Sequence, residues 1–190
     1  MGKQCYMLPF HMTPEGGIKV LLAKKRLLQK KVHSASIQVP PRAIRSGKAT
    51  PEGMIPNNAG QWVLIGGGQD DSTETEAVYR EFAEETGIDL KKVPGLLSDQ
   101  DIPVNNALWY CIAKRALLPE ALEKNIIGQI ESNNTPDDEL EKVEWVNLEE
   151  AIRRMQNPEP VDNVYLRQAN KPRDWYIEML SQVRRLSTSS

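Results

Sequence analysis

The stretch GGGQDDSTETEAVYREFAEETGI, residues 66–88, decides the fold of this chain of 190 residues. Three glycines come first, then acidic and hydroxyl side chains, then apolar residues at helical spacing. Either of two capping boxes can start a helix here, Asp71 with Glu74 or Thr73 with Glu76. The glycine near the end of the stretch is the residue type that ends helices in the left-handed conformation. The stretch therefore predicts a glycine loop followed by a helix that ends just before that last glycine.

Three carboxylates lie on one face of the predicted helix. Glu81, Glu84 and Glu85 stand at positions i, i+3 and i+4, so their side chains are neighbours. Val78 and Phe82 occupy an adjacent stripe that would pack the helix onto a sheet. Hard divalent cations such as Mg²⁺ prefer carboxylate and phosphate oxygens, and glycine lets the backbone approach a ligand closely. This pattern indicates a site for metal-assisted attack on a phosphate chain. Acidic helix faces without the adjoining glycines are more often simply solvated.

Apolar and amphipathic runs outside this stretch predict an α/β domain. A glycine turn at 15–17 favours a hairpin between the first two strands. Strands interspersed with helices are typical of α/β proteins. Strands are expected at 4–10, 18–23, 61–65, 107–113 and 143–146, and helices at 148–155 and 173–186. We expect one domain over residues 1–190.

Residues 29–60 show no sustained period and contain four prolines, Pro40, Pro41, Pro51 and Pro56. Only residues 36–39 could hold a short strand. A loop of this length is either disordered, an insertion, or a functional segment that covers a substrate. A homodimer interface is a further role for this segment.

Composition excludes several classes of protein. Lys and Arg number 24 and Asp and Glu number 26, so the net charge of −2 argues against general nucleic-acid or membrane-surface binding. Two cysteines, Cys5 and Cys111, are too few for a disulfide framework. No apolar run approaches the ~20 residues that span a bilayer. We expect a cytoplasmic protein that acts on a small molecule.

Residues 66–88 resemble the Nudix box of the Nudix hydrolase family, G-x5-E-x7-R-E-U-x-E-E-x-G-U, where U is a bulky apolar residue. Eight of the nine specified positions match, from Gly66 through the Arg80-Glu81 pair to Ile88. The exception is Ser72, which stands where the family has a glutamate. In the family that glutamate pairs with the arginine and braces the loop. The departure therefore concerns loop geometry and catalytic efficiency, whereas the metal-holding glutamates are present.

The resemblance implies an α/β/α sandwich with a mixed β-sheet and an enzyme that hydrolyses nucleotides with Mg²⁺ or Mn²⁺. Glu81, Glu84 and Glu85 would hold the metal, and Arg80 would orient these glutamates. The proton of the attacking water would pass to Glu139 or to a glutamate of the box, with Glu84 and Glu85 as the catalytic candidates there. Arg26, Gly66 and Gly67 would contact the substrate.

The substrate class follows less directly from the resemblance. Pro103 lies 15 residues past Ile88 (103 − 88), a spacing associated in the family with ADP-ribose pyrophosphatases. We therefore expect cleavage of a nucleoside diphosphate linked to another group, with ADP-ribose or another nucleotide sugar first and a nucleoside triphosphate next. The alternative is a catalytically weak module of the same fold that binds a nucleotide and regulates. Ser72 is the main feature in its favour.

Overall fold

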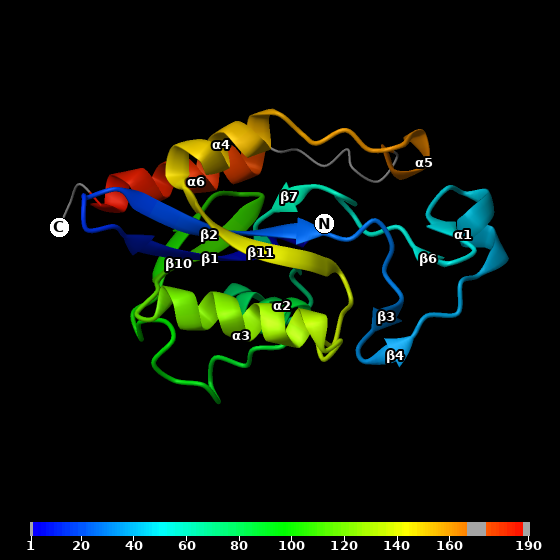
Figure 1. Cartoon of the computed structure of the whole chain (residues 1–190), viewed down its shortest axis with the longest axis horizontal. Coiled ribbons are helices and arrows are strands. Elements are labelled where there is room, and N and C mark those ends of the chain that lie inside the picture. Colours follow the sequence, from blue (N-terminus) through cyan, green and yellow to red (C-terminus); the bar gives the residue numbers. More distant parts are fainter. Residues whose placement is uncertain (1, 167–173, 188–190) are drawn as a thin grey trace.

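The computed structural model describes residues 2–166 and 174–187, in which strands and helices alternate along the chain (Figure 1). The strands are β1 (Gln4–Met12), β2 (Ile18–Lys25), β3 (Lys31–Val32), β4 (Ala35–Ser36), β5 (Ala49–Thr50), β6 (Gly53–Met54), β7 (Trp62–Val63), β8 (Ile65–Gly68), β9 (Ile102–Asn105), β10 (Trp109–Arg115) and β11 (Leu140–Asn147). The helices are α1 (Pro41–Arg45), α2 (Glu74–Thr86), α3 (Pro119–Glu131), α4 (Leu148–Gln156), α5 (Asn163–Leu166) and α6 (Asp174–Ser187). None of the helices within these two ranges has the length and apolar character needed to cross a membrane.

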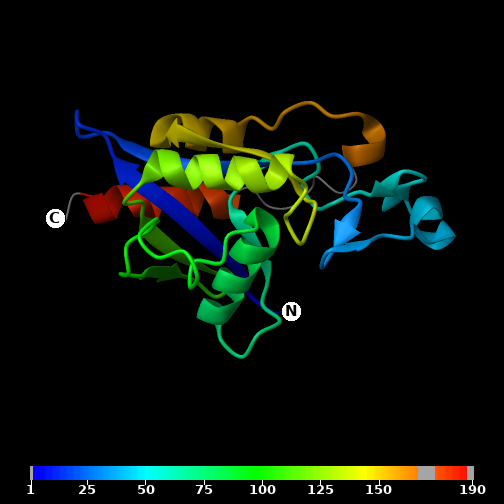
Figure 2. The same cartoon turned by 60° about the horizontal axis from the view of Figure 1, so that its bottom comes forward.

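A seven-stranded mixed sheet forms the middle layer. Its main path is β11-β2-β1-β10-β9, with β1 and β10 parallel and the other pairs antiparallel. Helices α2 and α3 cover one face, and α4 and α6 cover the other, as both views show (Figures 1 and 2). The buried apolar side chains form one cluster between these layers. This arrangement confirms the predicted α/β/α sandwich with a mixed sheet.

Strands β1 and β2 pair beside their hairpin turn and then part. Phe10 pairs with Val20 near the turn, but farther along β1 pairs with β8 and β2 pairs with β7. Strands β7 and β8 thus fill the opening between β1 and β2. The single strand expected at 61–65 is therefore wrong in its extent, because the chain changes partner at Leu64 and the three glycines continue as strand β8.

Helix α2 begins and ends where its sequence predicts. Of the two capping boxes, Thr73 with Glu76 forms: the Thr73 hydroxyl accepts a hydrogen bond from the Glu76 backbone N–H at 3.2 Å. Gly87 ends the helix with φ 74°, and its N–H donates to the Ala83 carbonyl. One stripe of the helix, which includes Phe82, packs against β1 and β8. The helix is therefore held rigidly against the glycine strand.

Residues 29–60 contain short regular elements beyond one end of the main sheet (Figures 1 and 2). They form the hairpin β3–β4, helix α1 and the hairpin β5–β6. The short strand expected at 36–39 lies earlier, at Ala35–Ser36, because the turn at His33 and Ser34 pairs it with Lys31–Val32. The segment thus contains short hairpins and a helix, which its irregular, proline-containing sequence did not predict.

Other boundaries differ modestly from expectation. Strand β10 starts at Trp109 rather than 107, and β11 extends the strand expected at 143–146 in both directions. Helix α4 matches its prediction, and α6 begins at Asp174, whereas residue 173 lies outside the described residues. Helix α3 was not predicted, although Leu122, Ile126 and Ile130 recur every four residues and are buried.

Candidate active site

A cavity of about 410 Å³ opens where β2, β8, α2 and the segment before β11 meet. Among the described residues, its charged lining is strongly acidic. Six carboxylates face it, against two basic side chains, Lys25 and Arg80. The carboxylates are Asp70, Glu81, Glu84, Glu85, Asp137 and Glu139. An anionic phosphate chain would be repelled from such a wall unless cations neutralised it.

Glu85 is the most buried of these carboxylates, with a side chain 4% exposed. It lies on the stripe of α2 that packs against the sheet, whereas Glu81 and Glu84 lie nearer the open side. Its Oε1 accepts a hydrogen bond of 2.5 Å from the Lys25 ammonium, which also pairs with Glu139. Lys25 itself is 7% exposed. A single buried ammonium therefore joins β2 to two acidic side chains.

Burial and neighbouring charges shift the pKa of these groups. Burial raises the pKa of Glu85, and the nearby carboxylate of Glu139 adds to this, although Lys25 opposes it. Burial also raises the pKa of Glu81, against the opposing effect of Arg80. For Lys25, burial lowers the pKa, but the carboxylates of Glu139 and Glu85 outweigh burial and raise it. The site thus keeps its ammonium charged while it disfavours further negative charge.

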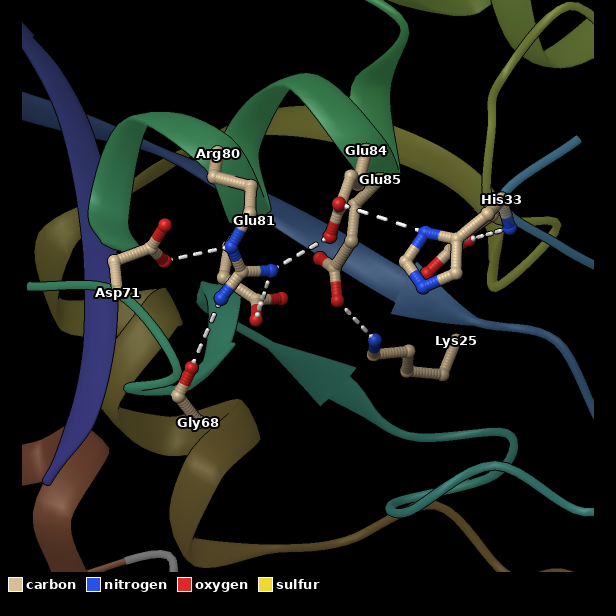
Figure 3. A network of polar contacts seen from close by, with 9 residues as sticks. Lys25, His33, Gly68, Asp71, Arg80, Glu81, Glu84 and Glu85 are labelled. Carbon is tan, nitrogen blue, oxygen red and sulfur yellow. Dashed lines mark hydrogen bonds and ion pairs between the residues drawn. The ribbon is translucent and has the colours of Figure 1, made fainter. Parts of the chain in front are cut away.

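Arg80 holds the glycine strand and the helix carboxylates together (Figure 3). Its guanidinium donates to the Glu84 Oε2 at 2.7 Å and to the Gly68 carbonyl at 3.2 Å. It also forms an ion pair with Glu81 at 2.9 Å. The planar guanidinium can serve several acceptors at fixed angles, so these contacts hold the Glu81 and Glu84 carboxylates beside the glycine strand.

The partner that braces Arg80 from the loop is Asp71. Its Oδ2 accepts a hydrogen bond of 2.7 Å from the Arg80 Nε. Ser72, where the Nudix box has a glutamate, instead donates to the Glu76 carboxylate at the start of α2. A carboxylate one residue earlier therefore makes the bond to arginine that Ser72 cannot make. The sequence comparison did not identify Asp71 as the partner of Arg80, because the spacing of the Nudix motif places its glutamate at position 72.

Gly67 lies against the Glu81 carboxylate. A Cβ built on this glycine would stand 2.5 Å from the Glu81 Oε2, closer than real side chains approach. Because Gly67 has no side chain, the Glu81 carboxylate of α2 can lie directly against the backbone of β8. Gly66 and Gly67 both line the cavity.

The segment 29–60 reaches this cavity through three polar residues, His33, Asn57 and Asn58. The His33 Nδ1 lies 3.6 Å from the Glu84 Oε1 and 3.9 Å from the Asp137 Oδ1 (Figure 3). None of these three residues carries a motif visible in the sequence, and His33 shows no partner spacing there that would predict a functional role. Their position favours the interpretation that the segment covers a substrate.

Two other predicted residues lie elsewhere. Arg26 is not among the described residues that line the cavity, and its Nε pairs with Asp138 at 2.9 Å. Its neighbour Lys25, the last residue of β2, lines the cavity instead. Pro103 is exposed on the edge strand β9 and also lies outside the cavity lining. Glu139, which the resemblance offers as a proton acceptor, does line the cavity.

The residues present fit a divalent cation. The Glu85 Oε2 is buried and has no hydrogen-bond partner among the described residues. An unpaired buried carboxylate oxygen is costly, and a cation would satisfy it. Glu81 and Glu84 line the same cavity, so oxygen ligands of the type that Mg²⁺ and Mn²⁺ prefer are available beside it.

Comparison with known proteins gives a family and several solved structures of similar fold. A family model described as NUDIX domain matches residues 15–168. Among solved structures, RenU, a Nudix hydrolase from M. smegmatis, is similar at 14% identity over 99% of this chain and 86% of its own, with a TM-score of 0.47. A C. elegans Ap4A hydrolase, in a binary complex, is similar at 14% identity over 100% of both chains, with a TM-score of 0.43. No curated protein matches the chain.

Proposed function

Because the chain belongs to the Nudix family of hydrolases, we propose that it uses a divalent metal to cleave the pyrophosphate bond of a nucleoside diphosphate linked to another group. The observation that carries this proposal is the charge of the cavity. Six carboxylates against Lys25 and Arg80 make a wall that can accept a phosphate chain only together with cations. A metal–nucleotide complex supplies both.

Glu81, Glu84 and Glu85 are the proposed metal ligands, with Mg²⁺ or Mn²⁺ as the ion. When bound, such an ion polarises a phosphorus and lowers the pKa of a coordinated water. The unpaired Oε2 of Glu85 is the oxygen in most need of a positive partner. Arg80 already holds the side chains of Glu81 and Glu84, so these two ligands need little rearrangement when a metal ion binds.

Glu139 is the proposed general base. It lines the cavity from the segment before β11, shares the Lys25 ammonium with Glu85, and its side chain is 24% exposed. Lys25 holds one of its oxygens, which fixes the side chain and leaves the other oxygen for a water proton. The backbone of Gly66 and Gly67 would contact the phosphates where no side chain intervenes.

We propose ADP-ribose or another nucleotide sugar as the first substrate class and nucleoside triphosphates as the next. The spacing of Pro103 from the box supports the first class, and the cavity volume of about 410 Å³ suits a small nucleotide. A cytoplasmic location is part of the proposal, since Cys5 and Cys111 are both free and buried. The alternative of a weak regulatory module loses its main support, because Asp71 makes the bond expected at position 72.

The test is hydrolysis of a nucleotide panel with Mg²⁺ and with Mn²⁺. The panel contains ADP-ribose, other nucleotide sugars, dinucleoside polyphosphates, NADH and the triphosphates. We expect metal-dependent turnover of one class, lost in Glu85→Gln and kept in Glu74→Gln. Glu74 is the matched control, since it lies on the same helix, outside the cavity lining, and pairs with Lys3. A folded protein that turns over none of these compounds would refute the enzymatic proposal and favour the binding module.

A further inference from the structure

The tip of hairpin β3–β4 has an unusual backbone for the residues it carries. His33 and Ser34 have φ values of 47° and 64°, and they connect the paired residues Val32 and Ala35. Two successive positive φ values define the type I′ turn, which normally takes Asn and Gly. Holding two side-chain-bearing residues in this region costs free energy that the surroundings must supply. The hairpin therefore places an imidazole at its tip at some expense to stability.

Hydrogen bonds fix this tip against the segment that precedes β11. The His33 backbone N–H donates to the Asp137 Oδ1 at 2.7 Å, and the Ser34 N–H donates to the Pro136 carbonyl at 2.8 Å. The Asp137 N–H in turn donates to the Glu84 carbonyl at 3.0 Å, at the end of α2. Three segments distant in sequence are thus joined at this point, and the Asp137 carboxylate is held in a defined orientation.

The side chains at this junction form a group of metal-ligand type. One ligand atom each of His33, Glu84 and Asp137 lies within 4.8 Å of the other two. The Nδ1 of His33 is 3.6 Å from the Glu84 Oε1 and 3.9 Å from the Asp137 Oδ1. Two ligands that are each about 2.1 Å from one ion lie roughly 3.0–3.4 Å apart, so the three side chains would have to draw closer together around a bound ion.

We propose that His33, Glu84 and Asp137 form a second divalent-cation position beside the carboxylates of α2, and that its imidazole selects a transition metal such as Zn²⁺ over Mg²⁺. One nitrogen and two carboxylates leave a coordination position open, as in zinc sites that act on a substrate. Imidazole suits Zn²⁺, whereas Mg²⁺ prefers oxygen ligands alone. The buried Oε2 of Glu85, which has no hydrogen-bond partner among the described residues, lines the same cavity and is a further oxygen available to a cation.

The position would connect the segment 29–60 to the catalytic helix. Glu84 is shared, because its Oε2 bonds to Arg80 while its Oε1 faces the histidine. An ion held there would tie the hairpin tip to α2 and fix the cavity wall to which Asn57 and Asn58 also contribute. This inference rests on the proposed function, since it adds a ligand set to the same cavity.

The first experiment uses the fact that the chain contains two histidines, His11 and His33. The full-length protein is labelled with ¹⁵N-histidine and titrated with Zn²⁺ and, separately, with Mg²⁺. We expect Zn²⁺ to shift the Nδ1 resonance of His33 and to leave His11 unchanged, because His11 makes an edge-to-face contact with Trp145 outside this cavity. Mg²⁺ should shift neither ring nitrogen. A Zn²⁺ titration that leaves the His33 resonance unmoved would overturn the proposal.

The second experiment measures Zn²⁺ and Mg²⁺ affinity of variants by chelator competition and calorimetry. His33→Asn keeps a residue that tolerates positive φ, so the hairpin is preserved while the imidazole is lost. We expect Zn²⁺ affinity to fall about tenfold or more in His33→Asn and in Asp137→Asn, with Mg²⁺ affinity changed less than about twofold. His11→Asn is the control and should bind both ions as the parent protein does. Equal Zn²⁺ affinity in His33→Asn and the parent would refute the site.

The two proposals fail in distinguishable ways. If the proposed function is wrong, no nucleotide is hydrolysed in any metal, but Zn²⁺ still shifts the His33 resonance. If this inference is wrong, Mg²⁺-dependent hydrolysis remains sensitive to Glu85→Gln while His33→Asn changes no metal affinity.

Discussion

Lys25→Met would test whether the buried ammonium stands in for positive charge that the site otherwise obtains from a cation. In the metal-free protein Lys25 neutralises Glu85 and Glu139, and methionine keeps much of the side-chain volume while it removes the charge. The variant leaves Glu85, 4% exposed, without its ammonium partner. The carboxylate must then become protonated or stay charged in an apolar environment, and either costs stability.

The magnitude follows from the burial of the partners. Removing one member of a buried ion pair costs about 3–5 kcal/mol. Glu139 is 24% exposed and is partly solvated, so the lower end, about 3 kcal/mol, applies. For a chain of this size, about 2–4 °C of Tm corresponds to each kcal/mol, which predicts a Tm lower by about 6–12 °C. Divalent metal should recover much of this loss, because a bound cation neutralises the same carboxylates.

The assay is thermal unfolding followed by circular dichroism, in a chelator and in excess Mg²⁺. Lys24→Met is the matched control: it removes the preceding ammonium, which pairs with Glu159 at 2.6 Å, and the two side chains are 19% and 42% exposed. This more exposed pair should contribute less than about 1 kcal/mol, independently of metal. The reasoning is refuted if Lys25→Met and Lys24→Met lower Tm equally, or if Mg²⁺ raises the Tm of Lys25→Met no more than that of the parent.

Three further predictions concern the loop, the glycine strand and the thiols. Asp71→Asn should lower metal-dependent turnover about tenfold, because it weakens the bond that holds the Arg80 guanidinium, and adding Ser72→Glu should restore part of the rate. Steady-state kinetics measure both effects, and an unchanged rate in Asp71→Asn would contradict this role of Asp71. Gly67→Ala should weaken Mg²⁺ binding measured by calorimetry, since its Cβ would meet the glutamate packed there at 2.5 Å, and unchanged affinity would speak against that contact. Burial raises the pKa of the Cys5 thiol to about 11 and raises that of Cys111 as well, so a thiol reagent at pH 8 should label neither until denaturant is added; rapid labelling of the native protein would contradict this.

Helix α2 shows how far local signals reach. Thr73, Gly87 and the spacing of the glutamates act within a few residues of one another, so the helix bounds and the shared face of the carboxylates follow from the chain itself. Residues 66–88 also fixed the family, and the family model confirms it. Helix α3 was not predicted, although its buried apolar residues recur at helical spacing in the sequence just as those of α2 do.

The identity of the residues around that helix depended on tertiary structure. Lys25 ends β2 and Arg26 follows it, and the pairing of β2 with β11 and β7 decides which of these two basic residues meets the carboxylates. Asp71 takes the bond to Arg80 because the loop conformation brings it there.

His33 and Asp137 are 104 residues apart, and no local pattern links them. Their contact exists because a strained turn docks on the segment before β11. The sequence by itself thus determined helix α2, the face that its glutamates share and the family, since these depend on short-range geometry. Only the folded chain decided which lysine, aspartate and histidine join that helix, because long-range hydrogen bonds and sheet register select among chemically similar neighbours.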